Sequence, residues 1–188
     1  MPIEKQIIWD RLVRTTHWLS ASLFLITYFF LEEGELLHRW AGYTVFATTC
    51  VRILWGFIGP PNARFKNFIP TYPSLKQHIV LLCRASREKG FLHKGSLETE
   101  PGHNPLGALM VLVLLTGLLL TAISGWMQTL DYFWGSDGVE LFHELSANIT
   151  LYAAGVHVLA VFVMSRLYAS SLVYTMLTGK RARHHDNN

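Results

Sequence analysis

Four apolar blocks alternate with polar, charged segments along the chain of 188 residues. The blocks cover about residues 13–31, 38–58, 105–127 and 141–166. Each block is close to the roughly 20 residues that an α-helix needs to cross a hydrocarbon core of about 30 Å. The pattern therefore predicts an all-α integral membrane protein whose four spans form a helix bundle, with residues 1–188 making a single membrane domain.

The connections between the blocks differ in length. Blocks one and two, and blocks three and four, are joined by short segments, so each pair is expected to be antiparallel. A longer loop covers residues 59–104, where Leu75, Ile79 and Leu82 share one helical face opposite basic residues. This spacing suits a helix that lies on the membrane surface, and it equally suits a loop helix packed on the bundle.

Lysine and arginine are divided unevenly between the two sides of the predicted bundle. Fifteen of the 16 lie on the side of the N-terminus, and only Arg39 lies on the other. Because basic loops stay in the cytoplasm, both termini and the 59–104 loop are expected to be cytoplasmic. No cleavage site follows the first block, so we expect that span to remain. The opposite side holds the acidic residues Glu32, Glu33, Glu35, Asp131, Asp137, Glu140 and Glu144.

Charge and cysteine content exclude several functions. The basic residues do not gather into one patch, so the pI near 9.0 indicates membrane topology and no nucleic-acid partner. Cys50 lies in a span and Cys83 in the long loop, which makes a disulfide between them improbable. Neither cysteine belongs to a C-x-x-C-H motif, and two thiols are too few for an iron–sulfur cluster.

Four of the nine histidines occur in or at the edge of predicted spans, where ionisable groups usually face the bundle interior. His17 lies near the cytoplasmic end of block one, and His38 begins block two at the outer side. His143 lies at the outer end of block four, and His157 follows 14 residues later, roughly 21 Å deeper at about 1.5 Å per residue. Depth therefore pairs His17 with His157, and His38 with His143.

Two imidazoles that face each other across a bundle are what a six-coordinate heme iron requires, and such an iron suits electron transfer. The alternatives are a zinc or copper site, or histidines that serve only as packing groups. A closed zinc site would want more ligands than each level offers, so heme is favoured. The remaining histidines are expected to be solvated: His78, His93, His103, His184 and His185.

Other polar and small residues are candidates for contacts with a cofactor. Arg14, Arg52 and Arg166 near the cytoplasmic ends, and Arg39 at the outer end, are placed to pair with heme propionates or a quinone oxygen. Snorkelling to lipid phosphates is the competing interpretation. Gly42, one turn after His38, and Gly155, beside His157, would let a macrocycle approach the backbone, and ordinary helix packing explains them equally well.

Several strings carry a resemblance to a known family. They are WDRLVRTTHW, LHRWAGY followed by VRILWGFIG, GHNPLGALM, and HELSAN followed by GVH. In order and spacing they resemble the bacterial cytochrome b561 and nickel-dependent hydrogenase b-type cytochrome family over nearly the whole chain. The resemblance implies a four-helix core, two b hemes and electron exchange with quinone, and it implies that His17, His38, His143 and His157 are the axial ligands.

Three functional hypotheses follow. The first is a di-heme carrier between the quinone pool and a periplasmic cytochrome c or redox enzyme; a hydrogenase-like enzyme is one candidate, although nothing in the chain singles it out. The second is a superoxide oxidase-type quinone reductase, an activity that a similar branch of the family has; seven acidic residues against Arg39 on the outer side disfavour it. The third is a non-redox, metal-binding or structural membrane subunit.

Overall fold

The computed structural model describes residues 8–67, 69–89, 104–168 and 170–180. Every regular element in these ranges is helical, which confirms the predicted all-α class. The described ranges contain two 3-10 helices, η1 (Phe65–Asn67) and η2 (Asp131–Phe133). The α-helices are α1 (Arg11–Phe30), α2 (Leu36–Ile58), α3 (Tyr72–Lys89), α4 (Pro105–Met127), α5 (Asp137–Leu167) and α6 (Leu172–Thr178).

Three helices in the described ranges are long and apolar enough to cross a membrane, namely α2, α4 and α5. They contain the predicted spans 38–58, 105–127 and 141–166, and α5 begins four residues before the predicted start of its span. α1 is not among the three, because Arg11, Arg14 and His17 lower the hydropathy of its first two turns. The chain is thus a membrane protein, and a fourth span along α1 stays a prediction.

A polar residue directly before the helix caps the first turn of two long helices, α1 and α4. The Asp10 side chain accepts a hydrogen bond of 2.9 Å from the backbone N–H of Val13 and so caps α1. Asn104 does the same for the N–H of Leu106 at the start of α4, and Pro105 occupies the first turn. Such caps satisfy N–H groups that have no partner within the helix. The local sequence therefore defines where these helices begin.

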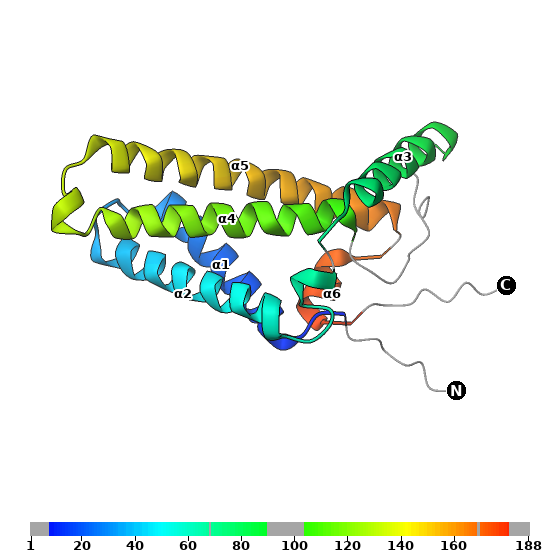
Figure 1. Cartoon of the computed structure of the whole chain (residues 1–188), viewed down its shortest axis with the longest axis horizontal. Coiled ribbons are helices and arrows are strands. Elements are labelled where there is room, and N and C mark those ends of the chain that lie inside the picture. Colours follow the sequence, from blue (N-terminus) through cyan, green and yellow to red (C-terminus); the bar gives the residue numbers. More distant parts are fainter. Residues whose placement is uncertain (1–7, 68, 90–103, 169, 181–188) are drawn as a thin grey trace.

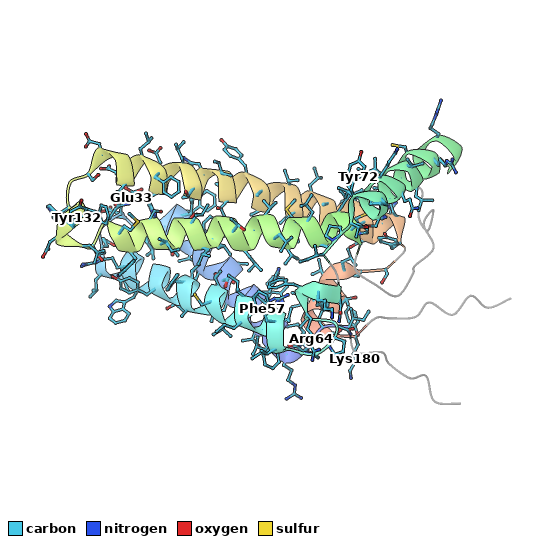
Figure 2. All side chains as sticks on the ribbon, viewed as in Figure 1. Glu33, Phe57, Arg64, Tyr72, Tyr132 and Lys180 are labelled. Carbon is cyan, nitrogen blue, oxygen red and sulfur yellow. The ribbon has the colours of Figure 1, made fainter. Side chains whose placement is uncertain are left out.

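α1, α2, α4 and α5 lie side by side along the long axis of the molecule (Figure 1). α1 packs on α2, α2 on α4, and α4 on α5. The turn at 31–35 and η2 lie at one end, which we call the acidic end, while η1, α3 and α6 lie at the other, the basic end. Figure 2 shows Glu33 at the acidic end, and Arg64 and Lys180 at the basic end. The uneven charge seen in the sequence thus separates along the helix axes.

Small hydroxyl residues fill the contacts between the long helices. Thr49, Ser124 and Thr150 are almost completely buried, whereas large apolar side chains such as Phe162 lie on the outside. A Cβ added to Gly117 would lie 2.4 Å from the Thr150 hydroxyl oxygen, so α4 and α5 approach each other closely there. Helices pack this way in membranes, because lipid and side chain are equally apolar and only close contact favours association.

The first and last described segments of the chain meet at the basic end. The backbone N–H of Ile8 donates a hydrogen bond of 2.8 Å to the carbonyl of Gly179, directly after α6. The Arg14 guanidinium donates to the Met176 carbonyl at 3.2 Å and also to the Leu177 carbonyl. These carbonyls lie at the C-terminal end of α6, where a cation is favoured. The start of α1 therefore holds α6 in place.

α3 projects from the basic end and contacts α4 (Figure 1). Leu75, His78 and Leu82 are half-buried. Ile79, which the pattern placed on the same face as both leucines, is 44% exposed. Its neighbours Val80 and Leu81 are exposed as well. The helix thus carries apolar residues on its packed side and on its open side. A membrane-surface role and a packing role for α3 are both compatible with this arrangement.

Candidate functional site

The structure brings the four histidines of the predicted spans together as two pairs. At the basic end, the rings of His17 on α1 and His157 on α5 have centroids 6.3 Å apart and planes at 60°. At the acidic end, the centroids of His38 on α2 and His143 on α5 are 6.4 Å apart, with planes at 59°. These are the partners that helix depth predicted. Two sites at opposite ends of the molecule therefore share almost the same geometry.

The ring separation is suited to one metal ion between each pair. A bond from a metal ion to an imidazole nitrogen is about 2 Å long, and the nitrogen lies about 1 Å from the ring centre, so two trans imidazoles would have centroids about 6 Å apart. The observed 6.3 and 6.4 Å agree with this value and are too long for a direct hydrogen bond between the rings. Two axial nitrogens per level are what a heme iron takes from the protein.

α4 orients His143 at the acidic end. Its Nδ1 lies 2.9 Å from the Thr121 carbonyl oxygen and 3.1 Å from the Ser124 hydroxyl oxygen. A carbonyl only accepts hydrogen bonds, so Nδ1 carries the hydrogen and Nε2 keeps a free lone pair. The Ser124 hydroxyl itself donates to the Leu120 carbonyl at 2.8 Å. A ligand histidine is commonly held in this way, with one nitrogen bonded to the backbone and the other turned to the metal.

Gly125 makes room for the same imidazole. A Cβ at this position would lie 2.9 Å from His143 Cε1 and 3.2 Å from Nδ1. The sequence interpretation missed Gly125, Ser124 and Thr121; the only available signal was a Ser-Gly pair within the most apolar block. Gly42 and Gly155 have open space where a Cβ would be, so helix packing requires neither as glycine. A role for either beside a macrocycle stays a prediction.

One histidine of each pair has a buried nitrogen that finds no hydrogen-bond partner among the described residues. These atoms are Nδ1 of His17 and Nδ1 of His38. Leaving such a polar atom unpaired costs about 1–3 kcal/mol, so native proteins normally satisfy it with protein, water or a bound group. The paired spacing, the oriented tautomer of His143 and these free nitrogens together fit a site for a bound metallocofactor.

The predicted arginines occupy different environments. Arg52 on α2 is buried, with its Cζ 5.5 Å from the centre of the Phe65 ring. Arg14 is engaged with the end of α6. Arg39, next to His38, and Arg166, in the last turn of α5, are exposed. Only Arg52 is thus enclosed in the helix core, and the cofactor contacts predicted for all four stay predictions.

The histidines outside the pairs call for one correction. His78 was expected to be solvated, but it is half-buried on α3, with a buried Nε2 that has no partner in the described structure, and burial lowers its pKa. The expectation failed because the loop forms a helix that packs on α4. His93, His103, His184 and His185 lie outside the described residues. Within the described ranges, no three His, Cys, Asp or Glu side chains gather into a metal site.

The fold and the paired imidazoles together define a helical membrane protein with two similar histidine pairs between its long helices. The family model of prokaryotic cytochrome b561 matches residues 8–179, and the chain belongs to that family. No curated protein and no solved structure gives a significant match. Family membership identifies a membrane b-type cytochrome, a class of heme protein that transfers electrons.

Proposed function

We propose that this cytochrome holds two b hemes, one between His17 and His157 and one between His38 and His143, and that it transfers electrons between the quinone pool and a periplasmic redox partner. The observation that carries the proposal is the equal geometry of the two pairs, at 6.3 and 6.4 Å, near opposite ends of the long helices. Two such sites provide a route across the thickness of a membrane.

The protein's contribution is to position ligands and to exclude water. When bound, each heme would supply an iron that changes its oxidation state by one electron, and the two histidines of each pair would hold it. α5 contributes one histidine to each pair, and the 14 residues between them set the spacing of the two levels at roughly 21 Å. Thr121 and Ser124 keep His143 in the tautomer that leaves Nε2 free.

The proposed topology is a four-helix bundle in the bacterial inner membrane, with α1 as the fourth span and both termini in the cytoplasm. The separation of charge supports it, because among the described residues every lysine and arginine except Arg39 lies toward the basic end, and basic segments remain on the cytoplasmic side. The acidic end then faces the periplasm. Its carboxylates would attract a basic partner, such as a cytochrome c or a redox enzyme, over long range.

Quinone and heme propionates are the proposed contacts of the site's other residues. Arg14, Arg52 and Arg166 lie toward the basic end, Arg39 lies at the acidic end beside His38, and Gly42 follows one turn later. The acidic end disfavours superoxide as a substrate there, because its carboxylates repel an anion. A metal-binding or structural subunit without redox activity, the other alternative, would show no Soret absorption.

The test is a reduced-minus-oxidised spectrum with heme quantitation on the purified protein. We expect two b hemes per chain in the wild type and one in each of His143→Ala and His157→Ala, with a different heme remaining in each variant. His78→Ala, which changes a histidine on α3, should keep both. A protein without heme, or with unchanged heme content in both variants, would contradict the proposal.

A further inference from the structure

Arg52 is a cation in the helix core with an incompletely satisfied side chain. The residue is 8% exposed, and its buried Nη1 has no hydrogen-bond partner among the described residues. One turn earlier on the same buried face, Thr49 is 1% exposed, and its hydroxyl also lacks a partner there. A buried guanidinium with an unpaired nitrogen and a buried, unpaired hydroxyl on the adjacent turn are what a site for an anion with several oxygens presents.

The groups around Arg52 compensate its charge only in part. Asp10 attracts it, but one carboxylate oxygen of Asp10 already accepts from the Val13 N–H and the other from Trp55 Nε1, at 2.9 and 3.0 Å. The Phe65 ring lies 5.5 Å from the guanidinium carbon. A cation over an aromatic face gains less than a direct ion pair does, because the ring carries no net charge. The guanidinium therefore keeps donor capacity for a further anion.

The pairing of α1 with α2 places this free donor at the level of the basic-end histidines. The two helices run antiparallel, and two hydrogen bonds fix how their residues align: Trp55 Nε1 to Asp10, at 3.0 Å, and Ser20 to Thr48, at 2.7 Å. Residues 49–52 of α2 thus lie beside residues 14–19 of α1, which include His17. Arg52 and Thr49 belong to the buried face of α2.

We propose that Arg52, assisted by the Thr49 hydroxyl, binds a carboxylate of the tetrapyrrole held by His17 and His157, and that its charge raises the reduction potential of that site. The inference rests on the proposed function and assigns Arg52 one of the roles considered for it. A guanidinium is matched to a carboxylate, since its planar donors meet both oxygens. A nearby positive charge also favours the iron state that carries one positive charge fewer.

The experiment compares wild type, Arg52→Gln and Arg52→Lys, each loaded in detergent either with heme or with the dimethyl ester of heme, whose propionates cannot ionise. Midpoint potentials and rates of heme release are measured for both hemes. With normal heme, Arg52→Gln should lower the potential of one heme only and release that heme about tenfold faster. Arg52→Lys should keep part of the shift, because it keeps the charge. Arg84→Gln, on exposed α3, is the matched control and should change nothing.

The esterified heme separates carboxylate binding from a general effect of the substitution. In the wild type it should speed the release of the same heme, because the carboxylate that Arg52 binds is blocked, and Arg52→Gln should add little further change to that rate. An equal acceleration of release by Arg52→Gln with normal and with esterified heme would overturn the inference, as would no acceleration at all. If Arg52→Gln does not fold, the rates at which the wild type releases normal heme and esterified heme still test the inference. A wild type that binds no heme would instead contradict the proposed function.

Discussion

The histidine pair at the acidic end and the pair at the basic end have nearly equal ring geometry, but the protein surrounds them differently. His143 is held by the Thr121 carbonyl and the Ser124 hydroxyl, whereas Nδ1 of His17 has no partner among the described residues. Glu33 lies at the acidic end (Figure 2). The buried Arg52 lies at the level of His17, as the hydrogen bonds that align α1 and α2 indicate. The two pairs thus have nearly the same ring spacing although the groups that surround their imidazoles differ.

This difference bears on electron transfer. A positive charge near a heme raises its reduction potential and negative charges lower it. If each pair holds a heme as proposed, the basic-end site should have the higher potential, so that an electron at the acidic end moves favourably toward the basic end. Equal ligands with unequal surroundings are a simple way to give two hemes different potentials on one scaffold.

The largest change is expected from Gly125→Leu, which should abolish the acidic-end site and leave only the basic-end histidine pair able to bind heme. A Cβ at Gly125 already falls 2.9 Å from His143, so the larger side chain must displace that imidazole. We expect loss of one heme, with the heme between His17 and His157 retained, as measured by heme content and spectra. Gly107→Leu on the same helix, where the nearest atom to a new Cβ is 3.8 Å away, should retain both. Two hemes in Gly125→Leu would refute this account of the site.

Arg14→Gln should weaken the basic end alone. The substitution removes two charge-assisted hydrogen bonds to α6 carbonyls, and each is worth about 1–2 kcal/mol. We expect faster hydrogen exchange in α6 and no change at the acidic-end heme. Arg11→Gln, at an exposed position in the first turn of α1, serves as the control. Unchanged exchange in α6 would show that the start of α1 does not hold it.

Ser124→Ala should sharpen the contrast by removing half of the support of His143. The Thr121 carbonyl would still accept from Nδ1, so the tautomer is retained while the ring is less firmly oriented. We expect the affinity for the acidic-end heme to fall about tenfold, measured from its dissociation rate. Ser20→Ala, which removes a hydroxyl between α1 and α2, should leave this rate unchanged. An equal effect of both variants would speak for general loosening.

The smallest effect concerns pH and the packing of α3 at the basic end. Burial lowers the pKa of His78, so the undocked helix binds a proton more readily than the docked one. Docking is therefore strongest above the ordinary histidine pKa of about 6.5 and weakens as pH falls below it. The loss should stay under about 1 kcal/mol, because the ring is only half-buried. Hydrogen exchange of α3 at pH 7.5 and 5.5 measures it, and His78→Phe should abolish the dependence.

Much of the fold could be predicted because its signals are local. The apolar block at 105–127 coincides with α4, and the polar cap Asn104 marks its start. α5 extends further than its apolar block, since Asp137 and Glu140 suit a helix N-terminus as well as a loop. α1 was predicted with the same weight as the others, although its arginines make it the least apolar of the four long helices.

The candidate site was predictable to a different degree. Histidine depth identified the two pairs, because distance along a helix is proportional to residue number. The supporting groups were missed, since Ser124 and Gly125 look like ordinary residues of an apolar span. His78 was misjudged because the sequence does not show which side of α3 meets α4.

The sequence by itself determined the apolar segments, the separation of charge between the two ends, and the levels of the four histidines, because each depends on composition or on rise along a single helix. The tertiary structure alone decided that Arg52 is buried, that Gly125 faces His143, and that Arg14 contacts α6. Those relations depend on how neighbouring helices are rotated about their axes and on where connecting segments, such as the one that contains η1, pack against the helices. Local sequence does not encode either, because both result from packing between residues far apart in the chain.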